Sequence, residues 1–143
     1  MTIHTLDIVP GRSVGPITLG MTRQEVWASH PWPITSFHKG PSSRERTDDL
    51  QAWGVHVFYE DGVASFIEAH LPVRHFDVRH VLDGLRIDDA AYPDVLEVAS
   101  ELGQMEQTAC GHEAPSRGVG LYRRDSVSDD PPPMAGVYVF PPR

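Results

Sequence analysis

The stretch VHVFYEDGVASFIEAHL, from Val55 to Leu71, decides the fold. The residues on either side of its Asp61-Gly62 pair alternate between apolar and other side chains, which is typical of half-buried strands. An Asp-Gly pair between two such runs is typical of a tight turn, because glycine tolerates the positive φ that the turn needs. We therefore predict a β-hairpin here. After the turn, one face is predicted to hold Val63, Ser65, Ile67, Ala69 and Leu71.

A short helix is predicted to begin after Thr22. Thr22-Arg23-Gln24-Glu25 fits a capping box, in which the Thr22 hydroxyl accepts a hydrogen bond from the Glu25 backbone N–H and the Glu25 side chain reaches back. The helix is predicted to end near His30, because Pro31 cannot continue it.

A second helix is predicted from Pro93 to Leu102. Proline suits the first helical position, and Gly103 suits the residue after the last turn. One side of this helix is predicted to be apolar. The other side carries Asp94, Glu97 and Glu101.

Further strands are predicted at residues 3–9, 118–123 and 136–140. Together with the hairpin and the two helices, they predict an α+β fold over a single domain, residues 1–143. We expect an antiparallel sheet of about four to six strands, packed against the two short helices.

Two of the remaining segments are predicted to be loops, and the secondary structure of a third is left undecided between helix and strand. Residues 40–49 are polar and predicted to be an exposed, mobile loop, and the proline-rich residues 129–133 a stiff connector. Residues 72–87 fit a helix or a strand. Residues 15–19 resemble residues 84–88, and each segment precedes a predicted helix. A degenerate duplicated unit and a chance match are both open explanations.

Composition narrows the classes of partner that the protein is expected to bind. The chain has 143 residues, with 12 Lys and Arg against 20 Asp and Glu, a net charge of −8 with neutral histidines. Nucleic acid is not an expected partner, because binding to phosphates depends on clustered basic residues. A membrane is not expected either, because no apolar run approaches the roughly 20 residues that span a bilayer. A cytoplasmic location is predicted, because Cys110 stands alone and no signal peptide is visible.

The negative charge is concentrated in two segments that contain no Lys or Arg, residues 54–71 and 88–106. Such clusters attract basic partners, although a solvated surface that keeps the protein soluble is the plainer interpretation. Two tryptophans beside predicted loops are interpreted either as core residues or as interface anchors. The predicted partner-binding residues are Asp88, Asp89, Asp94, Glu97, Glu101, Glu106, Glu60, Asp61, Glu68, Trp32 and Trp53.

Patterns of catalytic or metal-binding residues are weak. Glu68, His70, His75 and His80 lie within thirteen positions. Metal-binding histidines are typically four apart on a helix or two apart on a strand, and the spacing of five between these histidines matches neither. Cys110 lies close to His112, but catalytic Cys and His are usually distant in sequence. We therefore predict no catalytic residue, no metal and no other cofactor.

Residues 15–26, GPITLGMTRQEV, resemble the start of the helix in BamE/SmpA-like and β-lactamase-inhibitor-protein-like domains. They are also similar to a group of small bacterial proteins, some of which act as immunity proteins beside toxins. The resemblance implies a small layered α+β domain that binds another protein and has no chemistry of its own. The chain lacks the lipobox cysteine of the lipoproteins and the cysteine pair of the secreted inhibitors.

These observations predict a non-enzymatic protein-binding module. Its most concrete form is an immunity-type inhibitor whose acidic surface occludes a basic toxin. The alternative is a small metal-dependent hydrolase that uses Glu68, His70, His75 and His80. A third reading is a module that binds a small ligand or takes part in assembly.

Overall fold

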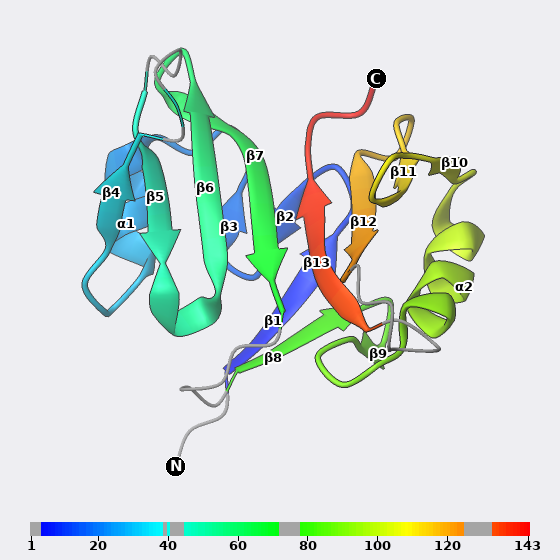
Figure 1. Ribbon diagram of the computed structural model, residues 1–143. Coiled ribbons are helices and arrows are strands. Elements are labelled where there is room, and N and C mark those ends of the chain that lie inside the picture. The colour runs from blue at the N-terminus through cyan, green and yellow to red at the C-terminus, as the bar shows by residue number, and fades with distance from the viewer. Residues whose placement is uncertain (1–3, 39, 41–44, 72–77, 125–132) are drawn as a thin grey trace.

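Two β-sheets and two α-helices make up the part of the chain that the computed structural model describes, residues 4–38, 40, 45–71, 78–124 and 133–143 (Figure 1). In chain order the elements are β1 (His4–Val9), β2 (Ser13–Val14), β3 (Ile17–Thr18), α1 (Arg23–Ser29), β4 (Thr35–Phe37), β5 (Thr47–Leu50), the 3₁₀ helix η1 (Gln51–Trp53), β6 (Val55–Glu60), β7 (Val63–His70), β8 (Val78–Leu82), β9 (Leu85–Arg86), α2 (Tyr92–Leu102), β10 (Glu106–Gln107), β11 (Gly111–Ala114), β12 (Val119–Arg123) and β13 (Met134–Val139).

The larger sheet has eight strands in the order β10-β11-β12-β13-β7-β6-β5-β4, and each neighbouring pair is antiparallel. The smaller sheet has five strands in the order β3-β2-β1-β8-β9, in which β1 and β8 are parallel. The predicted α+β fold with one sheet of four to six strands is therefore wrong, because strands dominate and form two sheets. Strands of two residues, such as β2, β3, β9 and β10, are too short to show an alternating pattern in the sequence.

Both predicted helices are present. In α1 the Thr22 hydroxyl accepts the Glu25 backbone N–H at 3.2 Å, and a Glu25 carboxylate oxygen accepts the Thr22 backbone N–H at 3.1 Å. These reciprocal bonds satisfy N–H groups that the first turn would otherwise leave without a partner. In α2 the buried residues are Tyr92, Val95 and Ala99, and Gly103 follows its last residue, Leu102, as the C-cap.

The predicted hairpin is β6–β7, and its turn residues Asp61 and Gly62 both have positive φ, 53° and 81°. The pairing contains a β-bulge that the sequence prediction omitted. Phe58 pairs with Phe66 but Tyr59 pairs with Ala64, so Ser65 is the extra residue. The predicted single face is therefore wrong at its start. Ile67, Ala69 and Leu71 are buried with Ala64, whereas Val63 and Ser65 are not.

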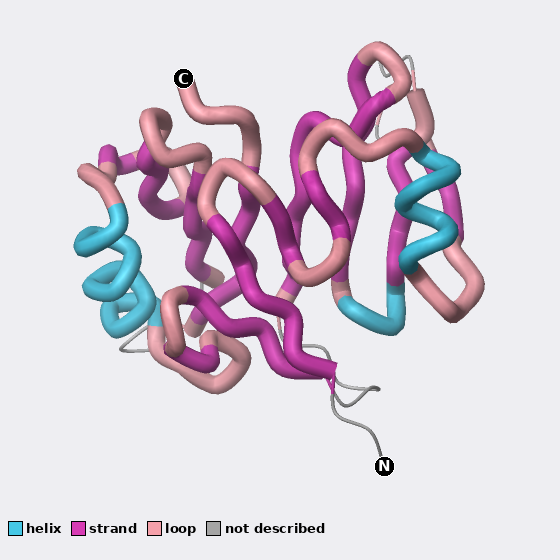
Figure 2. The backbone as a smooth tube through the Cα atoms, turned by 180° about the vertical axis from the view of Figure 1, so that it is seen from behind, coloured by secondary structure: helices cyan, strands magenta, loops and turns pink. Residues whose placement is uncertain are grey.

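The core lies on one side of the eight-stranded sheet. Val57, Ile67, Leu121 and Val137 point to this side and are fully buried. Figure 2 shows α1 and the strands of the five-stranded sheet on that side, and α2 lies at the end formed by β10–β12 (Figure 1). We call this side the enclosed face.

The same order of elements occurs twice along the chain. A β-hairpin, a helix and four antiparallel strands appear as β2-β3-α1-β4-β5-β6-β7 and as β8-β9-α2-β10-β11-β12-β13. The two four-stranded units meet where β7 pairs with β13. The similar segments 15–19 and 84–88 each contain the second strand of the hairpin that precedes the helix.

Three loop predictions need correction or fall outside the described residues. Residues 47–49 of the predicted mobile loop form β5, and Asp48 there is buried. The structure shows strands at residues 78–82 and 85–86, so this part of the open segment is not helical. Residues 72–77, residues 41–44 and most of the proline-rich connector lie outside the described residues.

Candidate functional site

A row of aromatic rings and histidines covers the other side of the eight-stranded sheet, which we call the open face. Alternation along the strands places these side chains opposite the core, and all of them are half-buried. None of the described helices or strands lies over this face (Figures 1 and 2). Its residues in the row are Phe37, His56, Phe58, Phe66, His70, Tyr122 and Tyr138.

The rings contact one another across the strands. The Phe66 and Tyr138 rings stack with centroids 5.0 Å apart, and the Tyr122 and Tyr138 rings stack at 6.1 Å. The centroids of His56 and His70 are 4.2 Å apart. The row therefore runs without a break across the two four-stranded units.

Two glycines allow the tyrosines to lie flat on the sheet. Gly120 pairs with Tyr138, and Gly136 pairs with Tyr122. A Cβ at Gly120 would lie 2.0 Å from the Tyr138 ring, and one at Gly136 would lie 2.3 Å from the Tyr122 ring. Any larger residue would lift the rings, so glycine is required for the flat arrangement.

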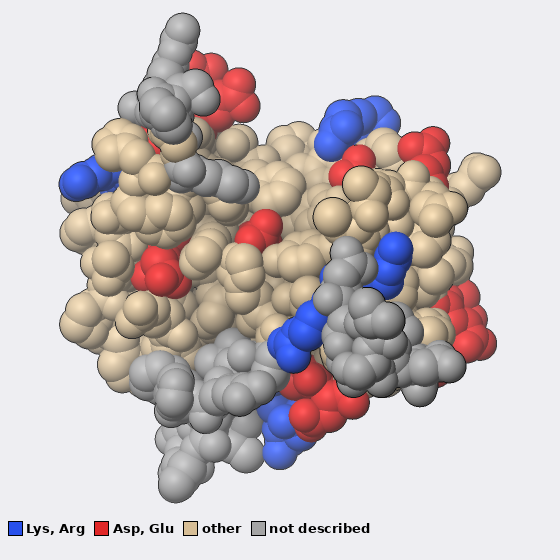
Figure 3. All heavy atoms as spheres, in the orientation of Figure 1, with Lys and Arg blue, Asp and Glu red and all other residues tan. Residues whose placement is uncertain are grey.

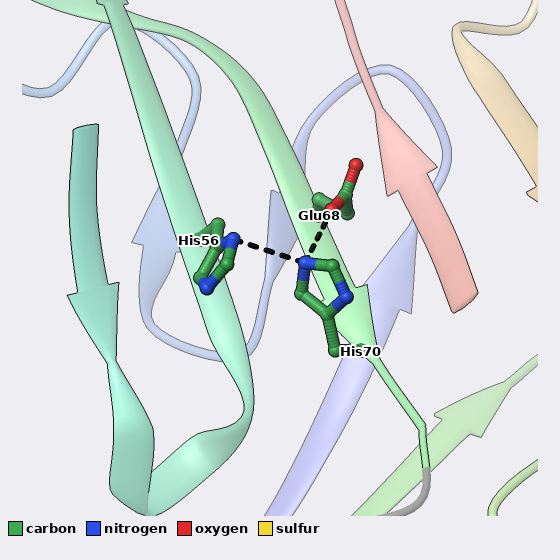
Figure 4. A group of neighbouring side chains, drawn as sticks. All are labelled: His56, Glu68 and His70. Carbon is green, nitrogen blue, oxygen red and sulfur yellow. Dashed lines mark hydrogen bonds and ion pairs between the residues drawn. The ribbon is translucent and has the colours of Figure 1, made fainter. Parts of the chain in front are cut away.

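His56, Glu68 and His70 converge near the middle of the open face (Figure 4). His56 Nδ1 lies 3.0 Å from His70 Nε2, and Glu68 Oε1 contacts the same His70 nitrogen. The three residues lie together because His56 on β6 pairs directly with Glu68 on β7, and His70 follows two residues later on the same face.

Two further residues hold this group. Asp49 Oδ1 lies 3.3 Å from His56 Nε2, and the Tyr122 hydroxyl lies 3.3 Å from His70 Nδ1. Burial raises the pKa of Tyr122 well above its usual value, and the nearby Glu68 carboxylate raises it further. The hydroxyl therefore keeps its proton at neutral pH.

Carboxylates lie among the aromatic rings. Asp49 and Glu68 belong to the middle of the face, and Glu106 pairs directly with Glu113 on the strands beyond Tyr138. The Tyr138 hydroxyl donates to Glu113 at 2.9 Å, and Arg143 lies 3.4 Å from Glu113. Figure 3 views this face and shows isolated acidic and basic groups on a mainly uncharged surface. A directly opposed pair of like charges costs stability, and Arg143 offsets part of that cost by pairing with Glu113.

The enclosed face carries its own carboxylate, which sequence reasoning missed. Asp48 is fully buried and accepts hydrogen bonds from Trp27 Nε1 at 2.7 Å, the Ser36 hydroxyl at 2.5 Å and the Tyr59 hydroxyl at 2.7 Å. Arg23 Nε lies 3.8 Å away. Burial raises the pKa of Tyr59, and its bond to Asp48 raises it further. This group joins α1 to β4, β5 and β6 and leaves Asp48 no exposed surface for a partner.

His80 is separated from Glu68 and His70. It is buried on β8, where Nδ1 lies 2.7 Å from Asp88 and Nε2 lies 2.8 Å from the Trp53 carbonyl oxygen. Burial alone would raise the pKa of Asp88, but hydrogen bonds from the His80 ring and backbone lower it overall. The predicted group of Glu68, His70, His75 and His80 is thus divided, since both His80 nitrogens are occupied and His75 lies outside the described residues.

The predicted partner-binding residues occupy several separate places. Asp94, Glu97 and Glu101 are exposed on α2, Glu60 and Asp61 are exposed at the β6–β7 turn, and Glu68 and Glu106 lie on the open face. Asp89 is exposed and pairs with Arg86, which also lies near Asp88. Of the tryptophans, Trp32 is 37% exposed, whereas Trp53 is 4% exposed and packs in the core.

Cys110 and its neighbours do not assemble as one group. Cys110 is exposed before β11. His112 points toward α2, where its Nδ1 lies 2.6 Å from the Tyr92 hydroxyl, and Glu113 points to the open face. Neighbouring strand residues point to opposite faces, as the sequence argument assumed.

Comparison of the chain with family models, curated proteins and solved structures finds no match. The resemblance of residues 15–26 to BamE/SmpA-like and inhibitor-like domains therefore stays a prediction. Among the described helices, none is long and apolar enough to cross a membrane.

Proposed function

We propose that the protein is a binding module that docks a basic protein partner on the open face. The observation that supports this most directly is the continuous row of half-exposed rings, with carboxylates between them and no described element over it. Half-exposed aromatic side chains supply large contact areas and dominate the affinity of many interfaces.

Charge complementarity favours a basic partner. Asp49, Glu68, Glu106 and Glu113 lie on the open face, where Arg143 is the basic residue paired with one of them. The chain as a whole has a net charge of −8. Because Arg143 already pairs with Glu113, a Lys or Arg side chain of the partner would pair with Glu106.

The acidic residues of α2 have a different part in this proposal. Asp94, Glu97 and Glu101 lie outside the aromatic row and are exposed to solvent. Exposed charges away from the contact accelerate encounter with an oppositely charged partner but add little to the lifetime of the complex. Inhibition of a basic toxin in the cytoplasm is the specific form of this function that the sequence predicts.

The test compares two matched charge reversals. The immobilised full chain is used to capture basic proteins, and association and dissociation rates are then measured at several salt concentrations. We expect Glu106→Lys and Tyr138→Ala to increase the dissociation rate at least about tenfold, as expected for contacts inside an interface. Glu97→Lys is expected to slow association, to an extent that shrinks as salt is added.

Two outcomes would contradict the docking face. One is that Glu97→Lys abolishes capture while Tyr138→Ala binds as the unchanged protein does, which would place the interface on α2. The other is that all of these variants fold and bind identically. Circular dichroism and denaturant unfolding of each variant show that it remains folded.

A further inference from the structure

We propose that His56, Glu68 and His70 form a binding site for a divalent transition-metal ion of the Zn²⁺ type. Each residue offers one ligand atom, and these atoms all lie within 4.8 Å of one another. Two imidazoles and one carboxylate form a ligand set that zinc uses when it keeps a fourth position open. The inference does not rest on the proposed docking function.

The contacts within the group bring together three atoms that can each act as a metal ligand. His70 Nε2 contacts both His56 Nδ1 and Glu68 Oε1, so a single N–H must serve two acceptors. His56 Nε2 faces the Asp49 carboxylate at 3.3 Å, which favours a proton on that nitrogen and a lone pair on Nδ1. When the His70 proton is on Nδ1 instead, facing the Tyr122 hydroxyl, three lone pairs point at one place and a metal ion can accept all three at once.

The residues around the group are those that orient metal ligands. Asp49 lies 3.3 Å from the far nitrogen of His56, and a carboxylate in that place orients and strengthens an imidazole ligand. The Tyr122 hydroxyl lies in the same relation to the far nitrogen of His70 and can accept its N–H when Nε2 binds a metal. Each imidazole thus has a partner that holds its ring toward the shared centre.

The open side of the group leaves room for a further ligand. The His70 side chain is 43% exposed, whereas that of Glu68 is 14% exposed. The ion would be held from the strand side and would face solvent on the other. A water molecule or a side chain of a bound protein is the fourth ligand that this arrangement admits.

Calorimetric titration of the metal-free full chain with Zn²⁺ alone tests the site. We expect one ion per chain at micromolar or tighter affinity. His56→Ala and His70→Ala are each expected to weaken binding by at least about 100-fold, because loss of a residue that only orients a ligand already costs roughly 10–100-fold. Asp49→Asn, which keeps all three ligands, is expected to weaken binding by about 10-fold or more.

His38→Ala is the matched control, because His38 is exposed and lies outside the group. The proposal is overturned if the unchanged protein does not bind Zn²⁺ in this range, or if His56→Ala and His70→Ala, shown to be folded, bind as tightly as the control.

Nitrogen-15 NMR of the imidazoles gives a second reading that needs no variant. We expect Zn²⁺ to shift His56 Nδ1 and His70 Nε2, and shifts confined to other histidines would overturn the site. None of these measurements uses a protein partner. Their failure would leave the docking proposal standing, and failure of docking would leave the metal site standing.

Discussion

Asp48 and Asp49 are neighbours on β5, yet they lie in opposite environments. Asp48 points to the enclosed face, where it is fully buried and accepts three hydrogen bonds from Trp27, Ser36 and Tyr59. Asp49 points to the open face, where its side chain is 22% exposed and contacts His56. The two positions differ in sequence by one residue and in structure by the thickness of the sheet.

The comparison distinguishes carboxylates that stabilise the fold from carboxylates that remain available to bind a ligand or a partner. A buried carboxylate must be fully hydrogen-bonded, because desolvation of an unpaired charge is costly. A half-exposed carboxylate keeps water as an alternative partner, so it can exchange that water for a metal ion or a basic side chain. Residue type alone therefore does not identify a functional acid in this chain.

The largest expected difference is between Asp48→Ala and Asp49→Ala. Asp48→Ala leaves three donors without their acceptor, so we expect it to lower the free energy of unfolding by roughly 3 kcal/mol. Asp49→Ala removes one half-exposed contact and is expected to cost less than about 1 kcal/mol. Urea unfolding of both variants at pH 7 measures the difference, and equal losses would show that the two faces are not distinct.

Substitution of the glycines beneath the tyrosines sharpens the comparison on the open side. In Gly120→Ala the new Cβ would meet the Tyr138 ring, so we expect a loss of about 2 kcal/mol from overpacking. Gly84→Ala is a control for the loss of a glycine, because its positive φ strains alanine but no atom lies within 4 Å of the added Cβ. We expect Gly120→Ala to perturb the near-ultraviolet tyrosine signal and Gly84→Ala to leave it unchanged. The opposite result would contradict the flat packing of the rings.

Asp88 extends the comparison to pH. Hydrogen bonds from His80 lower the pKa of Asp88 in the folded protein. The folded state therefore binds fewer protons than the unfolded state around pH 4, and the stability from Asp88 is complete above that pH and lost as the pH falls through the folded pKa. We expect Asp88→Asn to cost about 1.5 kcal/mol at pH 7. The gap from the unchanged protein should narrow below pH 4, and a gap that stays constant down to pH 3 would contradict this role.

The smallest effects are expected from two tyrosine hydroxyls. Tyr59→Phe removes a donor from buried Asp48 and is expected to cost about 1.5 kcal/mol, because the bond is to a charged acceptor. Tyr138→Phe removes a donor from half-exposed Glu113 and is expected to cost about 0.5 kcal/mol, because water replaces it. Thermal unfolding of both variants tests the order, and a larger loss in Tyr138→Phe would reverse it.

The sequence predicted the elements that local signals define. The capping box at Thr22, the stop at Gly103 and the Asp61-Gly62 turn each act over a few residues, and the structure contains all three features. Pairing between distant strands leaves no such signal. The parallel pairing of β1 with β8 and the antiparallel pairing of β7 with β13 could not be predicted. The number of sheets and the number of strands in them were therefore underestimated.

The strand β5, and with it the buried Asp48, was not predicted from the sequence, because most residues of this strand are polar. Residues 47–49, Thr-Asp-Asp, look like a loop because a strand is expected to carry apolar residues on its buried side. The buried side here is polar because Trp27, Ser36 and Tyr59 supply the hydrogen bonds that a carboxylate requires. These donors come from three separate elements, so only the folded structure reveals them.

The pairing of His56 with Glu68 could have been predicted from the sequence. A two-residue turn at Asp61-Gly62 would pair His56 with Ile67, whereas burial of Val57 with Ile67 requires His56 to pair with Glu68. The two registers differ by one residue, and only a bulge reconciles them. Counting both registers would have predicted the bulge and placed His56 beside Glu68 and His70.

The parallel ladder between β1 and β8 has a consequence for how the chain reaches its native state. Its partners, such as His4 and Val78, come from opposite halves of the sequence, and so do Ile67 and Val139 where β7 meets β13. The entropy of closing these long loops is lost before their contacts form, which slows folding. The first half of the chain cannot complete either sheet until the second half has been synthesised. Until then, β1 and β7 each expose an unpaired strand edge, and such edges invite aggregation.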